Sequence, residues 1–154
     1  MISFLQSPPS GGLFLLAFHR KFIIVFALML EGRIKSYLPA IIWAFLILAV
    51  SSVPDFSTPG LGFAMTDKIA HFVEYFILGF LTAKAVSTFD LKPLKIFWIS
   101  SALASGYGIL DEIHQFLIPG RTTEGLDMVA DILGSILAAA LFVRVRQRHA
   151  PGVH

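Results

Sequence analysis

The chain of 154 residues contains no cysteine and little charge. Without cysteine there can be no disulfide, no thiolate metal ligand, no covalently attached haem and no lipoprotein anchor. Charged residues make up 14% of the sequence, whereas a soluble domain usually carries about 25%. Apolar residues make up 56%, and the mean hydropathy is +0.77. Because so few polar residues cannot cover a globule of this size, we expect lipid to replace water around several segments.

The charge that is present gives no reason to expect a nucleic-acid partner. The formal net charge is only +2. The basic residues stand in short clusters beside apolar runs, which is where membrane topology places them. We therefore expect the lipid bilayer, and no nucleic acid, to be the principal partner.

Four apolar stretches are long enough to cross a bilayer, for which roughly 17 to 25 residues are needed. They cover residues 37–53, 69–88, 94–118 and 126–143. Proline and glycine punctuate their ends, as at Pro54 and at Pro119-Gly120. Loops this short make consecutive helices antiparallel neighbours. The sequence thus predicts an all-α fold, a membrane-embedded antiparallel bundle of four transmembrane helices.

An apolar N-terminal extension precedes this bundle. His19, Arg20 and Lys21 interrupt it near its middle, and such residues cost several kcal/mol at the centre of a bilayer. It does not resemble a signal peptide, because its basic residues lie within the apolar part. We interpret residues 1–36 as an interfacial or dispensable extension, residues 37–143 as the membrane domain and residues 144–154 as a basic cytoplasmic tail.

Lysine and arginine orient the bundle, because these residues are retained on the cytoplasmic side. Most of those in the core flank one end of the predicted spans: Arg33, Lys35, Lys84, Lys92, Lys95, Arg144, Arg146 and Arg148. The opposite end has only Lys68 and Arg121. Both termini of the core are therefore predicted to be cytoplasmic.

The remaining ionisable residues gather at the extracytoplasmic ends of the predicted spans. In chain order they are Asp55, Asp67, Lys68, His71, Glu74, Asp111, Glu112, His114, Arg121, Glu124, Asp127 and Asp131, and the polar Gln115 accompanies them. Helical spacing puts Asp67, His71 and Glu74 on one stripe, and Asp127 and Asp131 one turn apart. A carboxylate that faces lipid costs about 2.5–3.5 kcal/mol. We therefore expect these stripes to face inward and to form a vestibule open to the outside.

Two kinds of chemistry are open to such a vestibule. His71 and His114, with carboxylates at positions 74, 111 or 112, could hold Zn²⁺ and leave a site for water. Their spacing matches no established ligand motif, so no metal or other cofactor is assigned. Alternatively, His114 or His71 could act as a general acid or base while Arg121 holds a phosphate or carboxylate.

A third interpretation is structural. Lys68 would pair with Glu74 or Asp127, and Arg121 with Glu112 or Asp111, only to neutralise charge and fix the register of the helices. Small residues spaced four apart, Ala102 with Gly106 and Gly134 with Ala138, are expected to let helices approach closely.

Four motifs occur in a fixed order along the core. They are Ser51-Ser52-Val53-Pro54, then Asp67-Lys68-x-x-His71-Phe72-x-x-Tyr75, then Asp111-Glu112-x-His114-Gln115-x-x-x-Pro119-Gly120-Arg121, and Asp127-x-x-x-Asp131-x-x-Gly134. This series resembles the VanZ-like family of bacterial integral membrane proteins over residues 37–143. The chain departs from the family at Asp131, where asparagine is common, so an amide donor is replaced by a group that when ionised only accepts hydrogen bonds.

The resemblance implies a location and a theme. The location is the bacterial cytoplasmic membrane, with the polar site on its outer face. The named member of the family is associated with resistance to the glycopeptide teicoplanin. The resemblance thus favours a vestibule that recognises or modulates a cell-envelope component: a lipid headgroup, a lipid-linked peptidoglycan precursor or a glycopeptide antibiotic. The expected binding residues are Asp67, Lys68, Asp111, Gln115, Arg121, Asp127 and Asp131, with Lys68 and Arg121 as anion contacts.

The alternative is a membrane-embedded acid–base or metal-dependent enzyme that acts on an anionic lipid-linked substrate. In that case Glu112 and His114 would be the catalytic pair, and His71 and Glu74 would support them.

Overall fold

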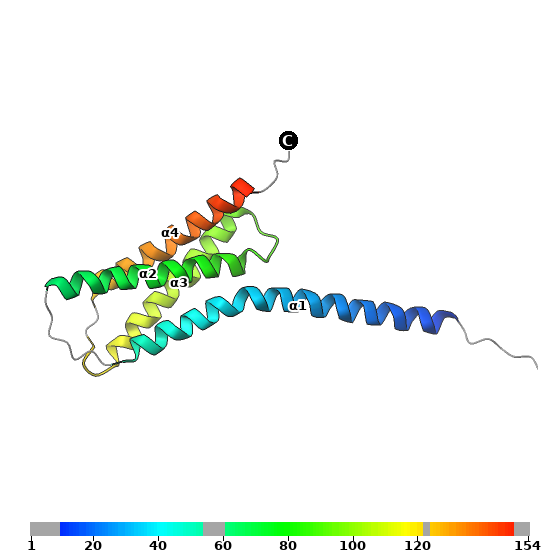
Figure 1. Ribbon diagram of the computed structural model, residues 1–154, viewed down its shortest axis with the longest axis horizontal. Helices are drawn as coiled ribbons and strands as arrows, with labels where there is room; N and C mark the ends of the chain where they lie inside the picture. The colour runs from blue at the N-terminus through cyan, green and yellow to red at the C-terminus, as the bar shows by residue number, and fades with distance from the viewer. Residues whose placement is uncertain (1–9, 54–60, 122–123, 150–154) are drawn as a thin grey trace, which may run out of the picture. The chain divides into compact units, whose positions relative to one another are not determined.

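The computed structural model describes residues 10–53, 61–121 and 124–149, with side chains from residue 31 onward except at 61–64 (Figure 1). Its helices are α1 (Ser10–Ser51), α2 (Leu61–Val86), α3 (Pro93–Phe116) and α4 (Gly125–His149). No strand occurs among these residues, so the predicted all-α fold is confirmed. The chain divides into two compact units, residues 1–34 and residues 35–154. The predicted loop that begins at Pro54 lies outside the described residues, as do residues 1–9 and 150–154.

Two helices are longer than the apolar runs that predicted them. Helix α1 begins at Ser10, far upstream of the expected start at Tyr37. Helix α4 continues to His149, so Arg144, Arg146 and Arg148 of the predicted basic tail are helical. The reason is that arginine and lysine lower hydropathy while remaining good helix formers. The apolar runs therefore predicted only the lipid-facing parts of α1 and α4, and both helices continue beyond those runs.

Three segments are long and apolar enough to cross a membrane: Glu31–Ser51, Met65–Val86 and Gly125–His149. Helix α3, the third predicted span, is not among them. Its C-terminal turns carry Asp111, Glu112 and His114, which lower its hydropathy although its length is sufficient. Length and composition thus support three of the four predicted membrane spans.

The distribution of side chains is the reverse of that in a soluble protein. Large apolar side chains are exposed on every helix, for example Phe45, Ile69, Trp98 and Leu133 at 66%, 59%, 61% and 55% exposure. Polar side chains are buried instead: Ser51, His71, Ser100, Ser101, Asp111, Glu112, Gln115, Asp127, Asp131 and Ser135. An apolar exterior of this extent requires an apolar surrounding, which a lipid bilayer provides.

Helices α2 and α4 lie side by side and form the most extensive contact among α2, α3 and α4 (Figure 1). A Cβ atom at Gly79 would lie 2.7 Å from the backbone oxygen of Ser135, and one at Gly134 would lie 3.0 Å from the backbone nitrogen of Phe76. Only glycine permits this approach, so the packing expected at Gly134 is confirmed. The expected contact at Gly106 is wrong, because nothing lies within 4 Å of a Cβ there.

Consecutive helices within residues 35–149 are antiparallel (Figure 1). At one end the Tyr37 hydroxyl and Thr88 Oγ1 lie 3.1 Å apart, and Arg146 donates a hydrogen bond to the backbone oxygen of Ser87. At the other end, the C-terminal turns of α1 and α3 lie beside the N-terminal turns of α2 and α4. That end contains the candidate site.

Candidate functional site

Polar side chains from all four helices meet at this second end of the bundle. We call the following set the polar cluster: Ser51, Ser52, Asp67, Lys68, His71, Asp111, Glu112, His114, Gln115, Asp127 and Asp131. Each helix presents its polar residues inward because turning them toward lipid would remove their hydrogen-bonding partners. In the structure the polar stripes of α2, α3 and α4 meet as the sequence predicts, and Ser51 of α1 joins them.

Hydrogen bonds join α1 to α3 at one side of the cluster. The Ser51 hydroxyl donates to Asp111 Oδ2 at 2.8 Å, and the Gln115 amide donates to the same oxygen at 2.9 Å. His114 Nε2 lies 3.0 Å from the Ser52 hydroxyl. Sequence reasoning did not count the two serines among the site residues. Their place at the end of an apolar run, just ahead of Val53-Pro54, was the signal available for including them.

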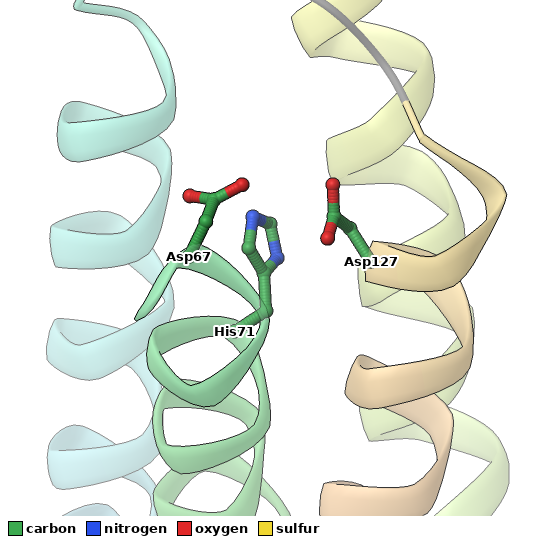
Figure 2. Close-up of side chains that lie close together, drawn as sticks. All are labelled: Asp67, His71 and Asp127. Atoms are coloured by element: carbon green, nitrogen blue, oxygen red, sulfur yellow. The ribbon is translucent and has the colours of Figure 1, made fainter. Parts of the chain in front are cut away.

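His71 is at the centre of the contact between α2 and α4. Its Nδ1 lies 3.0 Å from Asp131 Oδ1, and both side chains are buried. Figure 2 shows His71 between Asp67 of α2 and Asp127 of α4. One potential ligand atom from each of these three residues lies within 4.8 Å of the other two. The i, i+4 stripe on α2 therefore brings Asp67 and His71 together, as its spacing predicts.

Glu112 approaches the same histidine from α3. One potential ligand atom each of His71, Glu112 and Asp131 lie within 4.8 Å of one another. Glu112 is 4% exposed and Asp131 0%. Among the described residues, Glu112 Oε1 and Asp131 Oδ2 have no hydrogen-bond partner. Three helices thus enclose acceptor oxygens that the protein itself leaves unsatisfied, which is rare for buried polar atoms.

Lys68 is engaged within the protein. Its ammonium lies 2.6 Å from Glu124 Oε2 and 2.9 Å from Asp127 Oδ1. The predicted pairing of Lys68 with Asp127 is confirmed, whereas its alternative partner Glu74 is replaced by Glu124. Because two carboxylates already neutralise Lys68, this ammonium is a weaker anion contact than its charge suggested.

Arg121 does not form the ion pairs that were expected. Among the described residues, no ion pair joins it to Glu112 or Asp111, and its buried Nε has no hydrogen-bond partner. Its charge interacts instead with Glu74, which also lies within electrostatic range of His71. Arg121 therefore keeps donor capacity that another group can use.

Glu112 and His114 point to different sides of α3. Two residues turn a helix by about 200°. Glu112 accordingly lies near His71 of α2, and His114 contacts Ser52 beyond the end of α1. The structure does not bring together the catalytic pair that sequence reasoning had suggested, and His71 is the imidazole that Glu112 approaches.

Two grooves flank the N-terminal half of α4. One of about 260 Å³ lies between α3 and α4 and is lined by Glu112, Ile113, Phe116, Glu124, Gly125 and Met128. The other, of about 310 Å³, lies between α2 and α4 and is lined by apolar side chains and Lys68. Each groove thus combines apolar walls with a charged group.

The end of the bundle that holds the cluster is acidic overall. Its carboxylates are Asp67, Glu74, Asp111, Glu112, Glu124, Asp127 and Asp131, against the cations of Lys68 and Arg121. Unpaired carboxylates in a medium of low dielectric favour any ligand that brings positive charge or hydrogen-bond donors.

One of three comparisons with known proteins gives a match. A family model described as VanZ/LLP1 matches residues 18–146, which include α2 and α3 completely. The match begins upstream of Tyr37, so it takes in part of the segment that the four motifs had left outside the resemblance. Neither a curated protein nor a solved structure matches the chain.

The bonds of Ser51 predict a difference between two buried serines. Ser51→Ala removes a donor to Asp111 and leaves a buried acceptor with one bond fewer, so we expect a loss of about 1–3 kcal/mol in unfolding free energy. Ser101 is equally buried, but its hydroxyl has no hydrogen-bond partner among the described residues, so Ser101→Ala is expected to be neutral or stabilising. Thermal unfolding of the detergent-solubilised variants measures the difference. Equal losses in both would show that the Ser51 bonds contribute nothing particular.

Proposed function

The chain belongs to the VanZ/LLP1 family of membrane proteins, and we propose that its polar cluster binds a component of the bacterial cell envelope at the outer face of the cytoplasmic membrane. The observation that carries the proposal is the groove between α3 and α4. It presents a buried, unsatisfied carboxylate at Glu112 and an apolar wall at Ile113, Phe116 and Met128.

We propose that α3 crosses the membrane together with the other three helices. Its length of 24 residues corresponds to about 36 Å, enough for a hydrocarbon core of about 30 Å. Apart from Lys95 in its first turn, its exposed side chains are apolar, including Leu94, Leu103, Leu110 and Phe116. Its polar side chains Ser100, Ser101, Asp111, Glu112 and Gln115 are buried. The polar residues that lower its hydropathy therefore never need to meet lipid.

The charge distribution supports an outward orientation of the cluster. The opposite end of the bundle carries Lys92 and Lys95 at the start of α3, and Arg144, Arg146 and Arg148 near the end of α4. A surplus of basic residues marks the cytoplasmic side. The cluster then lies in the outer leaflet, where headgroups and lipid-linked wall precursors are exposed.

The groove fits an amphiphile better than a water-soluble molecule. An acyl or prenyl chain can lie along the exposed apolar side chains Ile113, Phe116 and Met128, which otherwise contact membrane lipid. Its polar head then reaches Glu112, whose Oε1 can accept a hydrogen bond from a hydroxyl or ammonium group. Arg121 can donate to a phosphate. Lipid headgroups, lipid-linked peptidoglycan precursors and acylated glycopeptides such as teicoplanin all combine these features.

A second candidate function is catalysis on an anionic lipid-linked substrate. The observation that favours it is the His71–Asp131 hydrogen bond, because a carboxylate bound to one imidazole nitrogen orients the ring for proton transfer at the other. Glu112 lies next to the same ring. In this version His71 and Glu112 are the acid–base pair, Glu74 is within electrostatic range of them, and His114 only positions α3 against α1.

Susceptibility to glycopeptides tests the proposed link to antibiotic resistance. A sensitive Gram-positive host that expresses the wild type should become less susceptible to teicoplanin but not to vancomycin, because only teicoplanin carries an acyl chain for the groove. The Glu112→Gln/His114→Asn variant should lose this shift at matched membrane abundance, since it removes the Glu112 carboxylate from the groove and the His114 imidazole from its contact with Ser52. The Ser101→Ala variant, changed outside the cluster, is the control.

Single substitutions then separate binding from catalysis. If His71 and Glu112 transfer protons, Glu112→Gln alone abolishes the shift, whereas a binding site loses only part of it and responds to Arg121→Ala as well. Unchanged teicoplanin susceptibility in cells that contain abundant, inserted wild type contradicts the link to resistance.

The absence of cysteine gives a direct test of sidedness, because a single introduced cysteine is the only thiol. Asp90 and Pro119 are exposed turn residues at opposite ends of the bundle. A membrane-impermeant maleimide added to intact cells should label Pro119→Cys and leave Asp90→Cys unlabelled until the membrane is opened. The reverse pattern would place the polar cluster in the cytoplasm and contradict the outward orientation.

A further inference from the structure

His71 lies beside two buried carboxylates, those of Glu112 and Asp131, whichever envelope component the protein binds. We propose that His71, Glu112 and Asp131 bind one divalent transition-metal ion, with Zn²⁺ as the best match. One nitrogen and two carboxylate oxygens, each from a different helix, lie within 4.8 Å of one another. Ligand atoms lie about 2.0–2.2 Å from zinc, so small side-chain rotations suffice to close the three residues around an ion.

The unsatisfied oxygens are the second observation that points to a cation. Glu112 Oε1 and Asp131 Oδ2 are buried, and among the described residues neither accepts a hydrogen bond. Two buried carboxylates that share a single histidine are costly in a helix bundle surrounded by lipid. A divalent cation neutralises both and occupies both oxygens. In the described part of the chain His71 Nδ1 bonds only the other oxygen of Asp131, and Lys68 pairs with Glu124 and Asp127, so Glu112 Oε1 and Asp131 Oδ2 remain without a partner.

The ligand set favours a transition metal over calcium or magnesium. Imidazole suits zinc and other late divalent ions, whereas calcium and magnesium prefer oxygen ligands alone. Three protein ligands leave a fourth position on zinc for water or for an oxygen of the bound amphiphile. Glu112 lines the groove between α3 and α4, which gives that fourth position a path to the exterior.

The neighbouring group of Asp67, His71 and Asp127 is a weaker candidate (Figure 2). Asp127 already accepts a hydrogen bond from the Lys68 ammonium at 2.9 Å, which neutralises it and places a positive charge beside the site. Asp67 is only partly buried, so water can solvate it. Asp67 and Asp127 therefore gain less from a bound cation than Glu112 and Asp131, which have buried oxygens without a partner.

Metal titration of the purified full-length protein tests this assignment. After removal of bound metal with a chelator, calorimetry with ZnCl₂ should show one tight equivalent in the wild type. Glu112→Gln and Asp131→Asn are close in size to the native residues, and each should weaken this binding at least tenfold. Glu124→Gln is the matched control, because Glu124 lines the same groove without belonging to the ligand set, and it should bind as the wild type does.

A second readout does not depend on the folding of any variant. Co²⁺ bound to the wild type should give the visible absorption of a four-coordinate site with nitrogen and oxygen ligands, and excess Zn²⁺ should remove it. The proposal is overturned if the wild type binds no tight equivalent, or if both variants bind as tightly as the wild type. Loss of binding in Asp127→Asn with retention in Glu112→Gln would move the ion to the neighbouring group and would also overturn the assignment.

Discussion

The cost of ionisable side chains in a lipid environment is the constraint on which the rest of this structure depends. Each of α2, α3 and α4 carries carboxylates within its outermost turns, and a carboxylate that faces lipid is costly. The helices therefore rotate until these stripes face one another, and the outward faces remain apolar. The close approach of α2 and α4 at Gly79 and Gly134 brings the His71 and Asp131 side chains within hydrogen-bonding distance. The buried polar cluster is thus a direct consequence of placing such a sequence in a membrane.

The cluster combines carboxylate oxygens that have hydrogen-bond partners with others that have none. Ser51 and Gln115 satisfy Asp111 Oδ2, so this side of the cluster fixes α1 against α3. Lys68 neutralises the carboxylates of Glu124 and Asp127 in the same way between α2 and α4. These contacts are what a purely structural role requires. Asp111 Oδ1, Glu112 Oε1 and Asp131 Oδ2 have no partner among the described residues, and the last two belong to one group that also includes His71. The proposed function therefore rests on the group of His71, Glu112 and Asp131.

Much of the fold could be predicted from the sequence because hydropathy and helical periodicity are local properties. The apolar runs predicted the positions of the helices, and the i, i+4 spacing of Asp67 and His71 predicted that they share one face of α2. The upstream start of α1 was missed because charged residues lower hydropathy without breaking a helix. The divergence of Glu112 and His114 follows from the helical period and was available from the sequence. The contact of Glu112 with His71 was not, because it depends on how far α3 is rotated against α2. A close approach contributes to that rotation, since a Cβ at Gly108 would lie 3.1 Å from Tyr75 Cε1 of α2.

Replacing Glu112 with an apolar side chain tests the central claim that this carboxylate is kept for a ligand and not for stability. The measurement is the thermal unfolding temperature of the metal-free protein in detergent for Glu112→Leu, compared with Asp111→Leu as the matched change on the same helix. The account predicts that Glu112→Leu unfolds at the wild-type temperature or above it, because an unsatisfied buried carboxylate is removed. Asp111→Leu should unfold several degrees lower, because Ser51 and Gln115 lose their acceptor. Equal destabilisation by both substitutions would contradict the account and make the whole cluster structural.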